Sequence, residues 1–169
     1  MNTIVACDKN WGIGKDGHLL CHLSSDLKFF KEKTLGKTVI MGRVTLESLP
    51  GGHGLPGRRN IVMTHDTDYT AEGAEVVHSL SDLEDAVEET PTDDLFIIGG
   101  AKIYEQFLLL CSDVFVTKVD AEFEADRFFL DLDKSCRFSL EDSSEVMEEN
   151  GIRYQFLHCV RELPEGGRR

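Results

Sequence analysis

The chain has 169 residues, a length that suits one domain and is too short for two of usual size. Hydrophobic residues make up 41% of it and charged residues 29%, a balance typical of a soluble globular protein. It carries 31 acidic and 18 basic side chains, a formal net charge of −13, which argues against a general binder of nucleic acid or anionic membranes, because those surfaces are themselves negative. Residues 27–65 nevertheless hold seven basic and two acidic side chains, a local charge of +5 that leaves −18 for the rest, and this basic segment suggests a small anionic ligand.

Short apolar, β-branched runs alternate with helical patterns along the chain. Strands are expected at 3–7, 38–41, 60–64, 76–78, 95–98 and 114–119, and helices at 25–34, 45–49, 81–89 and 102–110. Two alternating runs, around Phe138 and at 153–161, predict an antiparallel strand pair. Ser24 or Ser25 would cap the first helix, and Ser81 with Asp82 the third. The pattern predicts a single α/β domain over residues 1–169, with a mostly parallel central sheet and helices on both faces.

The cysteines and the N-terminus bear on the compartment. The five cysteines (Cys7, Cys21, Cys111, Cys136 and Cys159) are odd in number and form no C-x-x-C motif, which favours reduced thiols. Residues 1–8 lack the basic and long apolar regions of a signal peptide. The longest apolar run, residues 107–111, is far below the roughly 18 residues that span a bilayer. We therefore expect a cytoplasmic protein without a membrane partner.

Three strand ends carry residues suited to a ligand, which binds beyond the carboxyl ends of parallel strands. After the second strand, Gly42 to Thr45 bring a guanidinium and a hydroxyl to a helix start, where an anion is favoured; a plain helix cap with a surface arginine is the alternative. Gly99-Gly100 would let a ligand approach the backbone closely, or form only a tight turn, and no G-x-G-x-x-G motif is present. His65 could meet a phosphate or stay solvated.

Asp26 is the clearest candidate for chemistry. It falls in the first turn of a predicted helix and shares a face with Leu23, Leu27 and Phe30. A carboxylate on an apolar face is desolvated and has a raised pKa. Asp26 could then bind a cationic heterocycle through two hydrogen bonds or supply a proton, or it could simply interact with the helix dipole.

A zinc site competes with this interpretation. Its candidate ligands are His18, Cys21, His22 and Asp26. Residues 17–20 look loop-like, however, so the i, i+4 spacing of the two histidines is not secure. We expect no metal.

Six short motifs follow one another at consistent spacing. They are Ile13-Gly14 with Asp16-Gly17-His18-Leu19; Asp26-Leu27-x-x-Phe30; Gly42-Arg43-x-Thr45-x-Glu47-Ser48; Leu55-Pro56-Gly57-Arg58-x-Asn60; Ile98-Gly99-Gly100 with Ile103-Tyr104-x-x-Phe107; and Thr117 with Asp126. Together they resemble the dihydrofolate reductase family, in its bacterial chromosomal type, over essentially the whole chain. The resemblance implies NADPH-dependent reduction of 7,8-dihydrofolate to 5,6,7,8-tetrahydrofolate in one-carbon metabolism, by hydride transfer to C6 and protonation of N5.

The resemblance also assigns roles on the substrate side. Asp26 would bind the amidine edge of the pterin and raise the basicity of N5, and Thr117 would orient Asp26. Arg58 would clamp the glutamate α-carboxylate with its planar guanidinium. Cys21 takes the position of an indole that normally holds a water near the carboxylate. The implied substrate-binding set is Ile4, Val5, Ala6, Leu19, Asp26, Leu27, Phe30, Lys31, Ser48, Leu49, Leu55, Arg58, Ile98, Tyr104 and Thr117.

On the cofactor side, Ile98 and Tyr104 would flank the nicotinamide, and Arg43 and His65 would meet the 2′-phosphate. The family has a non-proline cis peptide at the position of Gly99-Gly100, and a mobile loop at residues 13–19. An adenosine-binding subdomain is expected at about 38–90. The implied cofactor-binding set is Ala6, Ile13, Gly14, Leu19, Gly42, Arg43, Val44, Thr45, Met63, Thr64, His65, Ile98, Gly99, Gly100, Ala101, Lys102, Ile103 and Tyr104.

The chain departs from the family pattern in three places. Leu20-Cys21 replaces the usual Pro-Trp and Ser24 a common proline, which predicts a wider pocket, slower hydride transfer or altered antifolate sensitivity. Asp66, directly after His65, would weaken the preference for NADPH over NADH. Ala125 stands where glycine is usual before Asp126 and would restrict the loop that supports residues 13–19.

The implied partners are dihydrofolate and antifolates of the trimethoprim or methotrexate kind, and we expect a monomer. Two other functions stay open. A reductase of the same fold could act on another pterin or a pyrimidine, or a homologue could bind its ligands without turnover.

Overall fold

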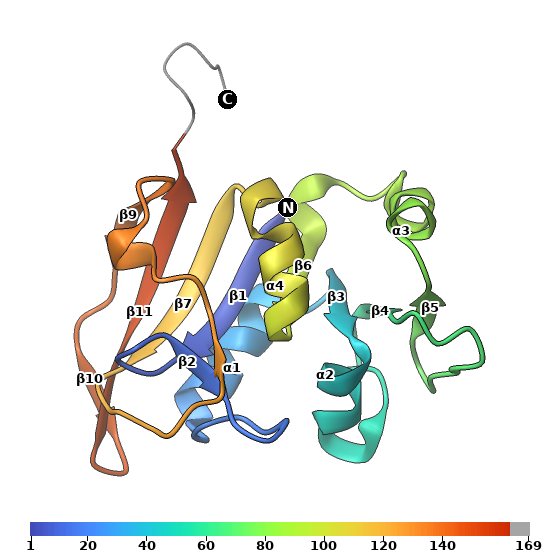
Figure 1. Cartoon of the computed structure of the whole chain (residues 1–169). Helices are drawn as coiled ribbons and strands as arrows, with labels where there is room; N and C mark the ends of the chain where they lie inside the picture. The colour runs from blue at the N-terminus through green and yellow to red at the C-terminus, as the bar shows by residue number, and fades with distance from the viewer. Residues whose placement is uncertain (163–169) are drawn as a thin grey trace.

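A nine-stranded sheet forms the centre of the computed structural model, which describes residues 1–162. Its strand order is β10-β11-β7-β1-β6-β3-β4-β5, and β9 pairs with β11 (Figure 1). Strands β7, β1, β6, β3, β4 and β5 run parallel, whereas β9, β10 and β11 add antiparallel pairs at one edge. The strands are β1 (Asn2–Cys7), β3 (Thr38–Gly42), β4 (Arg59–Met63), β5 (Glu75–Val77), β6 (Leu95–Gly99), β7 (Asp113–Val119), β9 (Phe138–Ser143), β10 (Met147–Glu149) and β11 (Ile152–Arg161).

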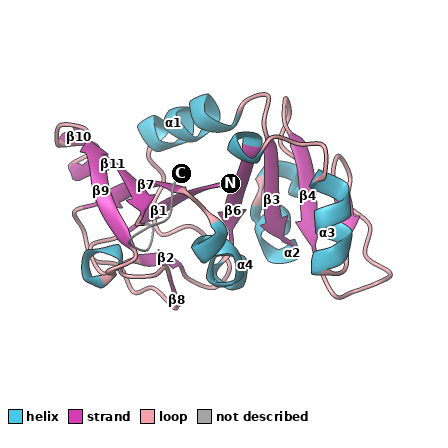
Figure 2. Ribbon diagram, turned by 90° about the horizontal axis from the view of Figure 1, so that it is seen from above, coloured by secondary structure: helices cyan, strands magenta, loops and turns pink. Residues whose placement is uncertain are grey.

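Helices cover both faces of this sheet, as the sequence predicts. The helices are α1 (Ser24–Thr34), α2 (Arg43–Ser48), α3 (Leu80–Val87) and α4 (Ala101–Phe107), and short 3-10 turns lie at Pro50–Gly52, Thr92–Asp94, Leu108–Leu110 and Leu132–Lys134. In Figure 2, α1 lies over one face and α4 over the other. A two-stranded ribbon of β2 (Gly12–Gly14) and β8 (Arg127–Phe128) stands beside α4.

The strands divide their side chains between two buried clusters. Val39 and Met41 of β3 pack into the cluster that also holds Leu46 of α2 and the half-buried Phe30 of α1. Ile40, between them, points into the opposite cluster with Phe107 of α4. Successive side chains of a strand point to opposite faces, so a strand buried on both sides reads as the continuous apolar run that the sequence shows. The predicted fold class is confirmed.

The predicted caps of two helices are wrong. Leu23 occupies the N-cap of α1, and no side chain of its own segment caps this helix. Helix α3 begins at Leu80, where the Ser79 side chain accepts a hydrogen bond from the Asp82 N–H; it ends at Val87 and not at residue 89. Ser79 is a better cap than Ser81 because its extended backbone lies outside the helix, as the N-cap position requires.

Other boundaries shift by a few residues. Helix α2 begins at Arg43, directly after Gly42 and two residues before the predicted start. Helix α4 gives way to the 3-10 turn Leu108–Leu110. The prediction missed β2, β8 and β10, which are only two or three residues long. An Asn150-Gly151 turn with φ of 53° and 78° joins β10 to β11, and this dipeptide is a strong hairpin signal.

In residues 1–162, no helix is long and apolar enough to cross a membrane. The predicted single domain of residues 1–169 includes residues 163–169, which lie outside the described part of the chain.

Candidate active site

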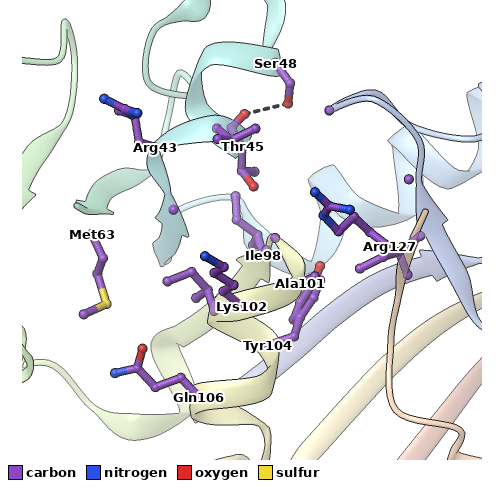
Figure 3. Close-up of a pocket in the computed structure, with 18 of the residues that line it drawn as sticks. Arg43, Thr45, Ser48, Met63, Ile98, Ala101, Lys102, Tyr104, Gln106 and Arg127 are labelled. Atoms are coloured by element: carbon purple, nitrogen blue, oxygen red, sulfur yellow. Dashed lines mark hydrogen bonds between the residues drawn. The ribbon is translucent and has the colours of Figure 1, made fainter. Parts of the chain in front are cut away.

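A cavity of about 610 Å³ opens at the carboxyl ends of the parallel strands, where a ligand is expected in such a sheet. Its walls come from the ends of β1, β3, β4 and β6, from residues 13–19 and 78–79, from β8, and from α2 and the starts of α3 and α4 (Figure 3). Its lining residues are Val5, Ala6, Ile13, Gly14, Gly17, His18, Leu19, Gly42, Arg43, Val44, Thr45, Ser48, Met63, Thr64, His65, His78, Ser79, Leu80, Ile98, Gly99, Gly100, Ala101, Lys102, Ile103, Tyr104, Gln106 and Arg127.

The charge of this lining is opposite to the charge of the whole chain. Within residues 1–162, the lining contains no aspartate or glutamate, although the chain carries 31 of them. It holds three permanent cations, Arg43, Lys102 and Arg127. Arg43 and Arg127 enter from opposite sides of the cavity in Figure 3, with Lys102 between them. An acid-free cavity with three cations favours an anionic ligand.

Glycines bring the backbone close to the cavity at two strand–helix junctions. The Gly99-Gly100 peptide bond is cis, as the sequence resemblance predicts, and Gly99 has a φ of 122° that other residues rarely adopt. A Cβ added to Gly100 would lie 3.2 Å from Thr45 Oγ1, and one added to Gly42 would lie 3.2 Å from Ile103 Cγ1. The two junctions are therefore packed as closely as side chains allow.

Asp26 lies in the first turn of α1, and its carboxylate accepts a hydrogen bond of 2.6 Å from Thr117 Oγ1 on β7. Burial raises the pKa of Asp26, and the hydrogen bond from Thr117 opposes part of this rise. The predicted raised pKa is confirmed. The same contact brings Asp26 and Thr117 together, as the family resemblance implies.

A strand register and an electrostatic effect place this pair near the cavity. Thr117 is the register partner of Ala6 on the neighbouring β1, and Ala6 lines the cavity. Tyr104, another lining residue, donates its hydroxyl to the Ile4 carbonyl at 2.8 Å. Burial raises the pKa of the Tyr104 hydroxyl, and the negative charge of Asp26 adds to the rise. The Asp26 carboxylate is therefore close enough to the cavity for its charge to act on a lining residue.

Arg58 is held in place without a carboxylate partner. Its Nε donates to Thr34 Oγ1 at 3.2 Å and its Nη1 to the Pro56 carbonyl at 2.7 Å. Its guanidinium lies 5.9 Å from the ring centroid of Phe30. In residues 1–162, no acidic side chain pairs with it. Arg58 is therefore oriented and free to bind an external carboxylate.

Cys21 lies outside the lining of the cavity. Its half-buried side chain packs against the cluster of Leu23, Val119 and Tyr154. Burial raises the pKa of its thiol, with a smaller contribution from Asp26, so the thiol is neutral at neutral pH. In residues 1–162, the four candidate zinc ligands do not come together as a group of three or more.

Two aspartates tie residues 8–16 to the segment 121–127. Buried Asp8 accepts the Gly12 N–H at 2.8 Å and the Phe123 N–H at 3.0 Å. Asp126 Oδ2 accepts the Asp16 N–H at 3.0 Å. A Cβ added to Gly12 would lie 2.5 Å from the Ala125 Cβ. The methyl group of Ala125 therefore fills the space that Gly12 leaves open.

All eighteen residues assigned to the cofactor from the sequence line the cavity. Their contacts with the cofactor stay a prediction. Of the substrate set, six residues line the cavity: Val5, Ala6, Leu19, Ser48, Ile98 and Tyr104. The other nine lie outside the lining: Ile4, Asp26, Leu27, Phe30, Lys31, Leu49, Leu55, Arg58 and Thr117.

Seven lining residues are absent from the sets assigned from the sequence: Gly17, His18, His78, Ser79, Leu80, Gln106 and Arg127. Of these, Gly17 and His18 belong to the mobile loop of residues 13–19 that the resemblance implies. His78 ends the strand predicted at 76–78, and Ser79 and Leu80 follow it, so all three could have been found by the strand-end rule. Arg127 has no local signal, because it reaches the cavity only through the pairing of β8 with β2.

With this geometry established, comparison with known proteins gives a consistent result. The sequence profile of the family described as Dihydrofolate reductase matches residues 1–161. The chain belongs to the dihydrofolate reductase family. It is 42% identical over 162 residues to the dihydrofolate reductase of Neisseria meningitidis serogroup B, covering 95% of this chain and 98% of that protein. It is 40% identical to the Bacillus subtilis dihydrofolate reductase, covering 93% of this chain and 92% of that one.

The fold agrees with this membership. The solved dihydrofolate reductase from Enterococcus faecalis, complexed with NADP(H) and RAB-propyl, superposes with a TM-score of 0.81 at 32% identity, and the match covers 95% of both chains. As a member of the dihydrofolate reductase family, the chain is an NADPH-dependent oxidoreductase.

Proposed function

We propose that this chain reduces 7,8-dihydrofolate to 5,6,7,8-tetrahydrofolate with NADPH, by hydride transfer to C6 and protonation of N5. One observation carries the proposal. A carboxylate of raised pKa, Asp26, is held by Thr117 at the edge of a cavity whose lining is cationic and free of acids. The cavity suits an anionic cofactor, and the carboxylate suits a heterocycle that presents hydrogen-bond donors.

The residues present fit NADPH. Arg43, Lys102 and Arg127 can meet its phosphates, and Gly42, Gly99 and Gly100 bring backbone without a side chain to the cavity wall. NADPH, when bound, supplies a hydride. Arg43 would hold the 2′-phosphate, although its guanidinium is already 3.2 Å from Asp66 Oδ2. Ile98 and Tyr104 would flank the nicotinamide ring.

On the substrate side, Asp26 would accept two hydrogen bonds from the amidine edge of the pterin. Thr117 would fix the orientation of Asp26, because its hydroxyl donates to one carboxylate oxygen and leaves the other free. The pKa of Asp26 is raised toward neutral pH. A catalytic group works best when its pKa lies near the operating pH, so this shift favours a role in the protonation of N5.

Arg58 would bind the α-carboxylate of the glutamate tail. This assignment distinguishes dihydrofolate from smaller pterins and pyrimidines, which carry no such carboxylate. Half-buried Phe30, Leu49 and Leu55, together with Leu27, would form the apolar wall between Asp26 and Arg58. The side chain of Leu27 is 54% exposed, so it has free surface to offer to a ligand.

Antifolates with a diaminopyrimidine edge would compete for the same carboxylate. Their binding to this chain, its monomeric state and a cytoplasmic location stay predictions.

The test is an assay of purified protein with NADPH and dihydrofolate, followed through the absorbance of the reduced nicotinamide. We expect oxidation of NADPH that depends on dihydrofolate and is lost in Asp26→Asn. Oxidation with a pterin that lacks the glutamate tail, at the same kcat/KM as with dihydrofolate, would instead favour a reductase of another pterin. Tight binding of NADPH without turnover would favour a binding-only homologue.

A further inference from the structure

Helix α1 begins without a cap from its own segment. The first N–H groups of a helix have no partner within the helix, and the leucine side chain at the N-cap, Leu23, cannot accept a hydrogen bond. A glutamate distant in the sequence takes this role. Glu149 Oε1 accepts the Ser24 N–H at 2.7 Å, and Oε2 accepts the Ser25 N–H at 3.1 Å and the Ser25 hydroxyl at 2.8 Å.

The position of Glu149 is set by the hairpin at the edge of the sheet. Glu149 is the last residue of β10 and faces Ile152 across the Asn150-Gly151 turn. Strand β11, which follows the turn, pairs Phe156 with Thr117 of β7. The same run of paired strands therefore carries both Glu149 and the hydroxyl that orients Asp26.

Helix α1 contacts this sheet edge at three successive points. Glu149 holds Ser24 and Ser25, Thr117 holds Asp26, and Phe29 stacks on Phe156 with ring centroids 4.2 Å apart. Asp26 follows Ser25 directly. A change in the hydrogen bonds of Ser24 and Ser25 therefore moves the backbone that carries the carboxylate.

We propose that Glu149 is a positioning residue, which fixes the first turn of α1 and so keeps the Asp26 carboxylate aligned with Thr117 and the substrate. Ser24 adds a donor that the proline common at this position in the family lacks, since proline has no N–H. The proposal rests on the proposed function, because Asp26 is taken as the group that binds the pterin.

The test compares Glu149→Ala and Glu149→Gln with the unmodified chain. Glu148→Gln is the matched control, because Glu148 is an exposed glutamate on the same strand whose side chain makes no hydrogen bond or ion pair in the described residues. We expect Glu149→Ala to lower kcat/KM for dihydrofolate roughly three- to tenfold through misalignment of Asp26. We also expect weaker binding of trimethoprim, a 2,4-diaminopyrimidine, and unchanged Kd for NADPH.

Glu149→Gln should fall between Glu149→Ala and the unmodified chain, because its carbonyl oxygen can still accept one N–H. Ser24→Pro removes one donor without removing the glutamate, and proline is well tolerated in the first helical position. Glu149→Ala already removes the one hydrogen bond that Ser24→Pro removes, so the double variant should lose no more activity than Glu149→Ala alone.

Thermal unfolding of each variant shows that the assays report folded protein. If Glu149→Ala does not fold, the same measurements on Glu149→Gln and Ser24→Pro test the proposal. The proposal is overturned if the variants match Glu148→Gln, or if affinity for NADPH falls as much as affinity for trimethoprim, which would indicate a general structural role. If the unmodified chain does not reduce dihydrofolate, the proposed function fails, and the trimethoprim measurement still tests the alignment of Asp26.

Discussion

The charge of Asp26 has opposite effects on stability and on the proposed binding of the pterin. Its surroundings raise its pKa, chiefly by burial, so the ionised form is less favourable in the folded chain than in the unfolded one. The free energy of unfolding therefore falls as the pH rises from the ordinary pKa of the group through its raised value in the folded chain. At neutral pH, the charge proposed to bind the pterin is a cost to stability, as is common at functional sites.

Asp26→Asn separates these effects. Asparagine cannot ionise, and its side-chain carbonyl can still accept the Thr117 hydroxyl. We expect a higher Tm at pH 7, no gain in Tm well below the ordinary pKa of aspartate, and a loss of roughly 100-fold or more in kcat. Calorimetry at both pH values and the NADPH assay check this, with Asp142→Asn, an exposed aspartate of β9, as the control. A lower Tm at pH 7 would contradict the assigned cost.

Asp66 bears on cofactor choice. Its Oδ2 lies 3.2 Å from Arg43 Nη1, and Glu47 lies 3.7 Å from Arg43 Nε, so a 2′-phosphate must compete for an arginine that is already paired. Asp66→Asn should lower the Kd for NADPH roughly two- to fivefold, the range of an exposed ion pair, and leave the Kd for NADH unchanged. Fluorescence titration measures both constants. An equal change in Asp68→Asn, the neighbouring exposed aspartate, would show that the effect is only one of net charge.

At the scale of elements, predictability depended on how local the signal was. The strand ends at Gly42, His65 and Gly99 were predicted from runs of a few residues, and the structure brings them to one cavity. The start of α1 was not predicted correctly. Its cap comes from Glu149, 125 residues from Ser24, and local residue preferences give no sign of such a distant contact. The β10–β11 hairpin was predictable from Asn150-Gly151 but was hidden by the acidic composition of residues 141–149.

The cap of α1 also gives the chain a specific acid sensitivity. The N–H groups of Ser24 and Ser25 lower the pKa of Glu149 from its ordinary value of 4.5 to about 2. A carboxyl group whose pKa is lowered on folding stabilises the folded chain at pH values above its ordinary pKa. This contribution is lost as the pH falls toward about 2. Glu149→Gln should therefore lose less of its free energy of unfolding than the unmodified chain between pH 4.5 and 2.

Urea unfolding at a series of pH values measures this difference. Glu148→Gln should follow the unmodified chain, because its side chain accepts no helix N–H. Parallel pH dependences of the Glu149→Gln variant and the unmodified chain would show that the carboxylate does not interact with the helix in solution.

At the scale of the whole molecule, the net charge of −13 and the acid-free cavity act on an anionic ligand in opposite directions. The basic segment 27–65 contributes Arg43 and His65 to the cavity, but Lys102 and Arg127 come from elsewhere in the chain. Of the three permanent cations of the lining, local charge along the sequence thus pointed to one, Arg43. The fold supplies the other two, from the first turn of α4 and from β8.

Screening decides which effect dominates at the cavity. The Debye length is about 10 Å at 0.1 M salt, so a phosphate bound beside one of the lining cations would be shielded from most of the surface acids. We expect the Kd for NADPH to rise with added salt.

Arg127→Met should raise the Kd for NADPH roughly two- to fivefold, the range of an exposed charge pair, and should flatten the salt dependence of this Kd. The control is Arg137→Met, which removes an exposed arginine outside the lining and should change neither quantity. Arg127 and Arg43 enter from opposite sides (Figure 3), so Arg127→Met should also leave the Kd for adenosine 2′,5′-bisphosphate unchanged. Isothermal titration at two salt concentrations tests each of these expectations, and a Kd that falls with salt would mean that the repulsive field of the whole chain outweighs the cavity.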